Sequence, residues 1–153
     1  FSGHVLMENQ HGLCVDLQLA PATGTAERKM ALRMLSRQAR RGIRPTSVGA
    51  DKGYHWRDFV RRLRRRGTRP HLACVRGRRT PGLDGRTTRH LSYRLSQRCR
   101  KKVEEIFGWV KTIGGLRKSR FRGVARTQYA SFLVGTAYNL LRLSRLQPQE
   151  IPA

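Results

Sequence analysis

Two acidic residues of this chain stand where carboxylates could hold a metal ion. The 153 residues include 33 Lys+Arg against 9 Asp+Glu, a formal net charge of +24, so acids are scarce. Asp51 ends the apolar segment SVGAD before a glycine turn, and Glu104 lies within residues 97–122, an amphipathic segment. Hard divalent ions such as Mg²⁺ and Mn²⁺ prefer oxygen ligands. The two acids therefore predict metal-assisted phosphoryl transfer.

The helical period predicts the setting of Glu104. Val103, Phe107 and Val110 fall on one apolar face of a helix. At roughly 100° per residue, Glu105 points toward solvent. The polar residues that share one stripe at the edge of the apolar face are Gln97, Arg100, Glu104 and Lys111. We therefore expect one helix around Glu104, with the carboxylate at the margin of a core.

Both acids also have an ordinary structural explanation. Arg100 and Glu104 are spaced for an i, i+4 ion pair, which stabilises a helix by about 0.3–0.5 kcal/mol. Asp51 is suited to cap the turn or the helix that follows it. The scarcity of acids and the presence of two such settings in one basic chain favour the metal interpretation.

The composition predicts a polyanionic partner. A pI near 11.8 favours nucleic acid, with an anionic membrane surface as the competing target. No apolar run reaches the length of a membrane-spanning helix. Clusters of arginine occur in residues 61–66, 76–89 and 117–122, and each is either a solvated face or a DNA contact. The density of charge favours DNA contact.

Cysteine and histidine patterns exclude two other classes of site. Cys14, Cys74 and Cys99 are odd in number and form no C-x-x-C pair, so neither a disulfide framework nor a zinc site is expected. The histidines show no metal spacing. A reducing cytosol fits this pattern, and no signal peptide is visible. The chain opens without methionine, which suggests that it begins inside a longer reading frame.

Local patterns predict one α/β domain over residues 1–153. Strands alternate with helices after an opening hairpin, which implies a mixed sheet. The expected elements are a hairpin over 3–20 with its turn at 10–12, a helix over 26–41 capped by Thr23 or Thr25, a strand over 46–50, a helix over 56–67, a strand over 71–75, a loop over 76–90, the helix around Glu104, and a last helix over 125–146.

Two segments resemble a known family. VGADKGYHWRDFVRRLRRRG resembles the second-aspartate segment of bacterial insertion-sequence DDE transposases. RCRKKVEEIFGWVKTIGGLRKSRFRG resembles their glutamate segment, with the signature Tyr-x2-Arg-x3-Glu-x6-Lys. Arg100, Glu104 and Lys111 match the last three signature positions, whereas Gln97 stands at the tyrosine position. GHVLMENQHGLCVDLQLAPATGTAERKMAL and ARTQYASFLVGTAYNLLRL also resemble this family.

The resemblance implies an RNase H-like mixed sheet flanked by helices, with an Asp, Asp, Glu site that binds Mg²⁺ or Mn²⁺. Asp51 and Glu104 are the catalytic and metal-holding acids that it assigns here. The family's first aspartate lies on the first strand, upstream of the segment that resembles residues 1–7, and Asp16 does not match it. The chain therefore resembles the C-terminal part of the catalytic domain, lacking its first strand, and is expected to be inactive by itself.

The implied function is cleavage and transfer of double-stranded DNA at element ends during transposition. The residues expected to contact DNA are Arg100, Lys111, Arg117, Lys118, Arg120 and Arg122. The implied location is the bacterial cytoplasm at the nucleoid, and a homodimer on DNA is compatible with this function. Two alternatives stay open: a remnant that binds DNA without cutting it, and a ribosomal-protein-like structural protein that binds nucleic acid without catalysis.

Overall fold

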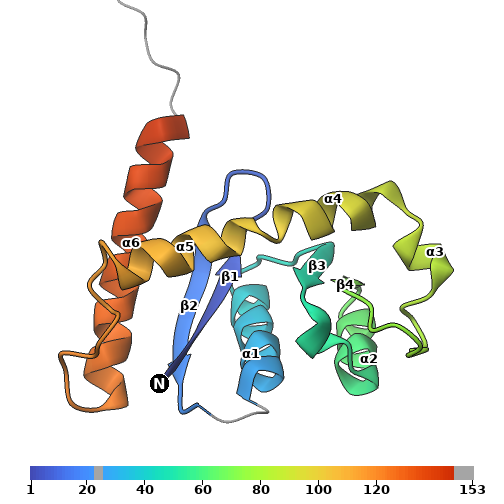
Figure 1. The fold of residues 1–153 in the computed structure, drawn as a ribbon, viewed down its shortest axis with the longest axis horizontal. Helices are drawn as coiled ribbons and strands as arrows, with labels where there is room; N and C mark the ends of the chain where they lie inside the picture. Colours follow the sequence, from blue (N-terminus) through green and yellow to red (C-terminus); the bar gives the residue numbers. More distant parts are fainter. Residues whose placement is uncertain (23–25, 147–153) are drawn as a thin grey trace, which may run out of the picture. The chain divides into compact units, whose positions relative to one another are not determined.

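The computed structural model describes residues 1–22 and 26–146, which form two compact units (Figure 1). The first unit takes its residues from Phe1–Met34 and Lys102–Ala153, and the second unit is Leu35–Lys101. Helix α1, Ala26–Arg40, contributes to both. This helix confirms the prediction over 26–41, whereas the predicted caps Thr23 and Thr25 lie outside the described residues.

A β-hairpin forms the sheet of the first unit. Strands β1, Ser2–Met7, and β2, Cys14–Ala20, pair antiparallel, with Val5 opposite Leu17. The alternating apolar residues predicted this hairpin, and the structure confirms it.

Helices α5, Lys102–Lys111, and α6, Val124–Leu146, complete the first unit (Figure 1). Helix α6 packs along β2, and α5 contacts both α6 and β1. The core of the unit centres on buried Ile106, Val110 and Tyr138. Trp109 meets Tyr138 edge to face, with ring centroids 5.6 Å apart, a preferred aromatic geometry.

The second unit is built on a parallel strand pair. Strands β3, Ser47–Ala50, and β4, Arg69–Leu72, are connected through helix η1, Lys52–Tyr54, and helix α2, Arg57–Arg65. Helix α2 buries Phe59, Val60 and Leu63, which supply the apolar core of this unit.

Helix α3, Gly85–Thr88, packs against β4, and helix α4, Leu91–Cys99, packs against both strands. Gly49 on β3 allows α4 to approach closely, because a Cβ atom at this position would lie 2.8 Å from the Ser96 hydroxyl oxygen. Tyr93 fastens α4 to β4 by donating its hydroxyl to the Leu72 carbonyl at 2.8 Å.

Two sequence predictions in this unit were wrong in part. The strand expected over 71–75 spans Arg69–Leu72. The Ala73 N–H still donates to the Ala50 carbonyl at 2.9 Å, whereas the Val75 N–H donates to Nδ1 of buried His55 at 2.9 Å. The segment 76–90, expected as a loop, contains α3. Asp84 caps this short helix by accepting from the Arg86 N–H at 3.0 Å.

The helix expected to run through Gln97 and Glu104 is two helices. Helix α4 ends at Cys99 and α5 begins at Lys102, so Arg100 and Lys101 separate them. The boundary between the two units falls directly after Lys101. The α/β class is confirmed, but the strands described in residues 1–22 and 26–146 form two two-stranded sheets instead of one mixed sheet.

Candidate metal and nucleic-acid site

Asp51 directly follows β3, as the sequence predicted. Its backbone is extended, with φ −78° and ψ −174°, and Oδ1 accepts a hydrogen bond from the Gly53 N–H at 2.8 Å. This contact is the predicted turn cap. The residue is exposed, so the cap leaves its carboxylate accessible to a further ligand.

Glu104 lies in the first turn of α5 and is exposed. The sequence predicted a place at the margin of the core for Glu104 and a solvent-facing place for Glu105, and in the structure both residues are exposed. The expected stripe from Gln97 to Lys111 assumed one continuous helix, whereas Gln97 lies in α4 and both Glu104 and Lys111 lie in α5.

Several acids of the described chain have a partner of opposite charge. These pairs include Glu8 with His11, Asp58 with Arg61 and Arg62, Asp84 with Arg86, and Glu105 with Arg142. Within residues 1–22 and 26–146, no ion pair involves Asp51, Glu104 or Glu27. Both glutamates stand in first helical turns, where the helix dipole favours a negative charge. The helix dipole offsets the lack of a cationic partner for the two glutamates. The lack is therefore most notable for Asp51.

The two acids suit a hard cation in type, because each is an exposed carboxylate without an arginine partner. Asp51 belongs to the second unit and Glu104 to the first. Among the described residues, no group of three His, Cys, Asp or Glu gathers as a metal site. Binding of one ion by both Asp51 and Glu104 stays a prediction.

The other signature positions have different roles in the structure. Arg100 is half-buried after the end of α4, and its Nε atom is buried without a hydrogen-bond partner among the described residues. Lys111 is exposed at the end of α5. Gln97, which replaces the signature tyrosine, donates its amide to the His71 carbonyl and so ties α4 to β4.

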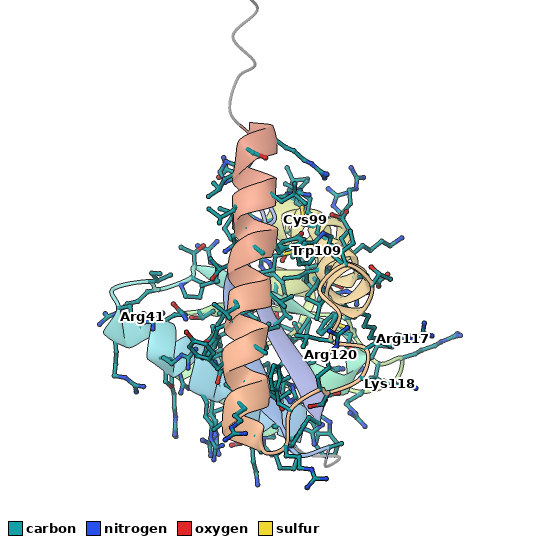
Figure 2. The ribbon with its side chains drawn as sticks, turned by 90° about the vertical axis from the view of Figure 1, so that its left-hand side faces the viewer. Arg41, Cys99, Trp109, Arg117, Lys118 and Arg120 are labelled. Carbon is teal, nitrogen blue, oxygen red and sulfur yellow. The ribbon has the colours of Figure 1, made fainter. Side chains whose placement is uncertain are left out.

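The basic segment 117–122 lies between α5 and α6 and is exposed throughout. Figure 2 shows Arg117 and Lys118 extending away from the ribbon. The Ser119 hydroxyl bonds to the Phe121 carbonyl at 2.8 Å and to the Thr127 hydroxyl at 3.1 Å, which fastens this segment to α6. The cationic side chains around Ser119 therefore have an anchored backbone and accessible charges.

A polar pocket in the second unit was not anticipated from the sequence. It has a volume of about 470 Å³, and Arg64, Arg69 and His71 contribute to its walls. Burial lowers the pKa of His71, and the neighbouring charges of Arg69, His90 and Arg64 lower it further. The density of arginine was the only sequence signal, because the lining residues come from separate elements.

The family model described as Transposase DDE domain matches residues 1–140. The chain belongs to this family. Comparison with curated proteins and with solved structures finds no match. In the part of the chain that the structure describes, none of the helices combines the length and the apolar character that crossing a membrane requires.

Proposed function

We propose that this chain acts in DNA transposition, as a transposase domain that binds double-stranded DNA at element ends and takes part in metal-dependent strand cleavage and transfer. The family match over residues 1–140 carries this proposal. The exposed cations of segment 117–122 support DNA binding, because the affinity of proteins for duplex DNA comes largely from phosphate contacts. The ribosomal-protein-like alternative has no comparable support.

In this proposal the two units together form one catalytic domain, and Asp51 and Glu104 hold Mg²⁺ or Mn²⁺. A bound divalent ion would supply Lewis-acid stabilisation of charge on the phosphate oxygens. The protein's own part is to position the carboxylates. Asp51 is held at the end of β3 by its bond from the Gly53 N–H, and Glu104 is presented by the first turn of α5. Arg100 and Lys111 contribute positive charge toward the DNA backbone.

The resemblance implies a third carboxylate, which we propose is supplied by a strand outside the present sequence. In the described sheets β1 pairs only with β2, and β3 pairs only with β4, so β1 and β3 each keep one edge without a strand partner. A strand that carries the third acid would have backbone partners at such an edge. The 153-residue chain is then expected to bind DNA and to depend on this strand for cleavage.

The proposed setting is the bacterial cytoplasm, at the nucleoid, with the chain in an insertion sequence. A homodimer on DNA fits the joining of two element ends, because each end then has its own protomer.

Paramagnetic Mn²⁺ tests whether one ion uses both acids. In the presence of a DNA duplex, Mn²⁺ should broaden the amide signals of Gly53 and Glu105 together. Asp51→Asn and Glu104→Gln should each abolish both effects, whereas Asp58→Asn is the control at an exposed acid outside the site. Broadening of one amide that survives loss of the other acid would show two separate ion sites.

Strand cleavage of a labelled duplex carrying the element end tests the function itself, in Mg²⁺ and then in Mn²⁺. The chain alone should bind the duplex without cutting it. Addition of the upstream aspartate-bearing strand, in cis or as a separate chain, should restore metal-dependent nicking that Glu104→Gln abolishes. Nicking that persists in both Asp51→Asn and Glu104→Gln would exclude these acids from catalysis.

A further inference from the structure

The pocket of the second unit is lined almost entirely by polar and cationic side chains. Its walls come from α2, β4, the segment before α3, α3 itself and the beginning of α4. The volume of about 470 Å³ lies within the range of small-molecule sites, roughly 300–1,000 Å³. Such sites are usually lined mainly by apolar groups, and the polar walls here favour a polar or charged ligand.

Arg64 is held in place at the pocket by groups on the facing segment. Its Nε and Nη2 atoms donate to the Gly82 carbonyl at 3.0 and 2.7 Å, and Nη2 also donates to the Thr87 hydroxyl at 2.7 Å. A guanidinium group has five N–H donors, so the two on Nη1 are not used in these bonds. Arg64 therefore offers donors from a side chain whose geometry is already set.

His71, which also lines the pocket, has an unsatisfied polar group. The residue is only 2% exposed, and its Nδ1 atom is buried without a hydrogen-bond partner among the described residues. Its ring packs edge to face against Tyr93, with centroids 5.7 Å apart, so the ring orientation is constrained. A buried ring nitrogen without a partner is costly, which makes an acceptor or donor from a ligand favourable.

The balance of charge in the pocket is positive. Arg64, Arg69 and Arg86 line it together with a single acid, Asp84, which pairs with Arg86 at 2.9 Å. Three positive charges against one negative leave a net charge of about two, before any protonation of histidine. A tetrahedral anion can accept from several of these donors at once, and arginine is well suited to phosphate oxygens.

We propose that this pocket binds a phosphate group. Its volume exceeds what one phosphate requires, so it has room for a phosphate attached to a sugar. Two sources share this chemistry: a backbone phosphate of a DNA strand, and the phosphate of a free small molecule. The DNA source rests on the proposed function, whereas phosphate binding by the pocket does not.

The register of the strands relates the pocket to Asp51. His71 on β4 pairs with Gly49 on β3, two residues before Asp51. At about 3.3 Å per residue, Gly49 and Asp51 are about 7 Å apart along the strand direction. In this proposal a DNA strand with one phosphate in the pocket extends toward Asp51. The pocket would then position the strand without itself taking part in cleavage.

The test follows the ring signals of His71 and His90 by NMR in the full chain during two titrations. One titration adds inorganic phosphate, and the other adds a short DNA duplex of arbitrary sequence. Both histidine signals should shift saturably with phosphate, while His4 of the first unit serves as the reference. A matching response to the duplex assigns the site to a DNA phosphate, and a response to phosphate alone assigns it to a free phosphorylated molecule.

Matched variants distinguish phosphate binding in the pocket from attraction by the overall positive charge of the protein. Arg69→Gln with Arg86→Gln should weaken phosphate binding at least about tenfold, because two charge-assisted donors are lost. Arg57→Gln with Arg65→Gln removes the same charge from exposed ends of α2 outside the pocket and should leave phosphate binding nearly unchanged. Asp84→Asn keeps an acceptor for the α3 cap and should tighten phosphate binding.

Three results would overturn the phosphate site: histidine signals that do not respond to either titrant, equal weakening in both double variants, or weaker binding in Asp84→Asn. Overall DNA affinity, measured on the same samples by fluorescence anisotropy, keeps the two proposals distinct. Strong DNA binding without a change in the His71 and His90 signals would contradict the phosphate site and leave the proposed function unaffected. If the double variant does not fold, Asp84→Asn and the parent titrations still decide the question.

Discussion

Asn139 on α6 binds both backbone groups of Cys14 at the start of β2. Its Oδ1 atom accepts from the Cys14 N–H at 2.7 Å, and its Nδ2 atom donates to the Cys14 carbonyl at 2.8 Å. Gln128, farther back on α6, makes the same kind of contact with Leu19 N–H at 2.7 Å and Leu17 carbonyl at 2.9 Å. The two side-chain amides hydrogen-bond to backbone groups on the edge of β2 that faces away from β1. Helix α6 therefore protects a strand edge that would otherwise be open.

Asn139→Leu should therefore destabilise the protein by about 1–3 kcal/mol, because it leaves two part-buried backbone groups of Cys14 without partners. The free energy of unfolding, measured by urea denaturation, checks this. Thr136→Ala is the control, since Thr136 is exposed and bonds only within its own helix. Equal stability of Asn139→Leu and the parent chain would show that water replaces the amide.

The two glycines near the end of α5 should respond in opposite directions to alanine. At Gly114, a Cβ atom would lie 2.6 Å from the Val134 side chain and 2.8 Å from the Val110 carbonyl oxygen, so Gly114→Ala should cost about 1–3 kcal/mol. At Gly108 a Cβ atom meets nothing within 4 Å, so Gly108→Ala should stabilise by about 0.5–1 kcal/mol through helix propensity. Thermal melts of both variants test the packing of α5 on α6, and a stabilising Gly114→Ala would contradict it.

Stability should fall as the pH drops below about 6.5. Burial lowers the pKa of His4, His55 and His71 below the ordinary value of 6.5. The unfolded chain therefore binds protons first, and the stabilisation that is complete above pH 6.5 is lost as the pH falls through the folded pKa values. Protonation of His55 on Nδ1 would also remove the acceptor of the Val75 N–H.

The free energy of unfolding measured between pH 8 and pH 5 tests this, because unperturbed carboxyl groups titrate at lower pH. His55→Gln should flatten the decline, since the titrating group is gone and the amide oxygen can still accept from Val75. His11→Gln, at an exposed position, should leave most of the decline in place. A pH-independent stability of the parent chain would show that the pKa values of these rings are the same in the folded and unfolded chain.

DNA affinity should depend steeply on salt, with a slope of log affinity against log salt of roughly −0.9 per phosphate neutralised. Neutralising Arg117, Lys118, Arg120 and Arg122 together should flatten the slope by up to about 3.6, which is four contacts at 0.9 each.

Neutralising Lys29, Arg33, Arg40 and Arg41 instead removes the same charge from exposed positions on and just after α1. This control should change the slope less. The same flattening in both quadruple variants would mean that segment 117–122 has no special role.

Local patterns in the sequence were sufficient for the elements whose cause is local. Apolar alternation predicted the hairpin of β1 and β2, helical periodicity predicted α1 and α6 nearly to their ends, and the apolar run before Asp51 predicted its place at a strand end. Periodicity and caps depend on neighbouring residues, so they can be read without knowledge of the fold. The family resemblance was likewise carried by short segments.

Contacts between distant residues decided the rest. Cys14 and Asn139 are 125 residues apart, and no local pattern indicates that the Asn139 side chain hydrogen-bonds to the Cys14 backbone. His55 accepts from the Val75 N–H after the end of β4, and the pocket joins Arg64 of α2 to His71 of β4 and His90 before α4. The interruption at Arg100 and Lys101 has no glycine or proline to signal it. Such features arise when separate elements pack and satisfy one another's polar groups, and only the tertiary structure specifies that packing.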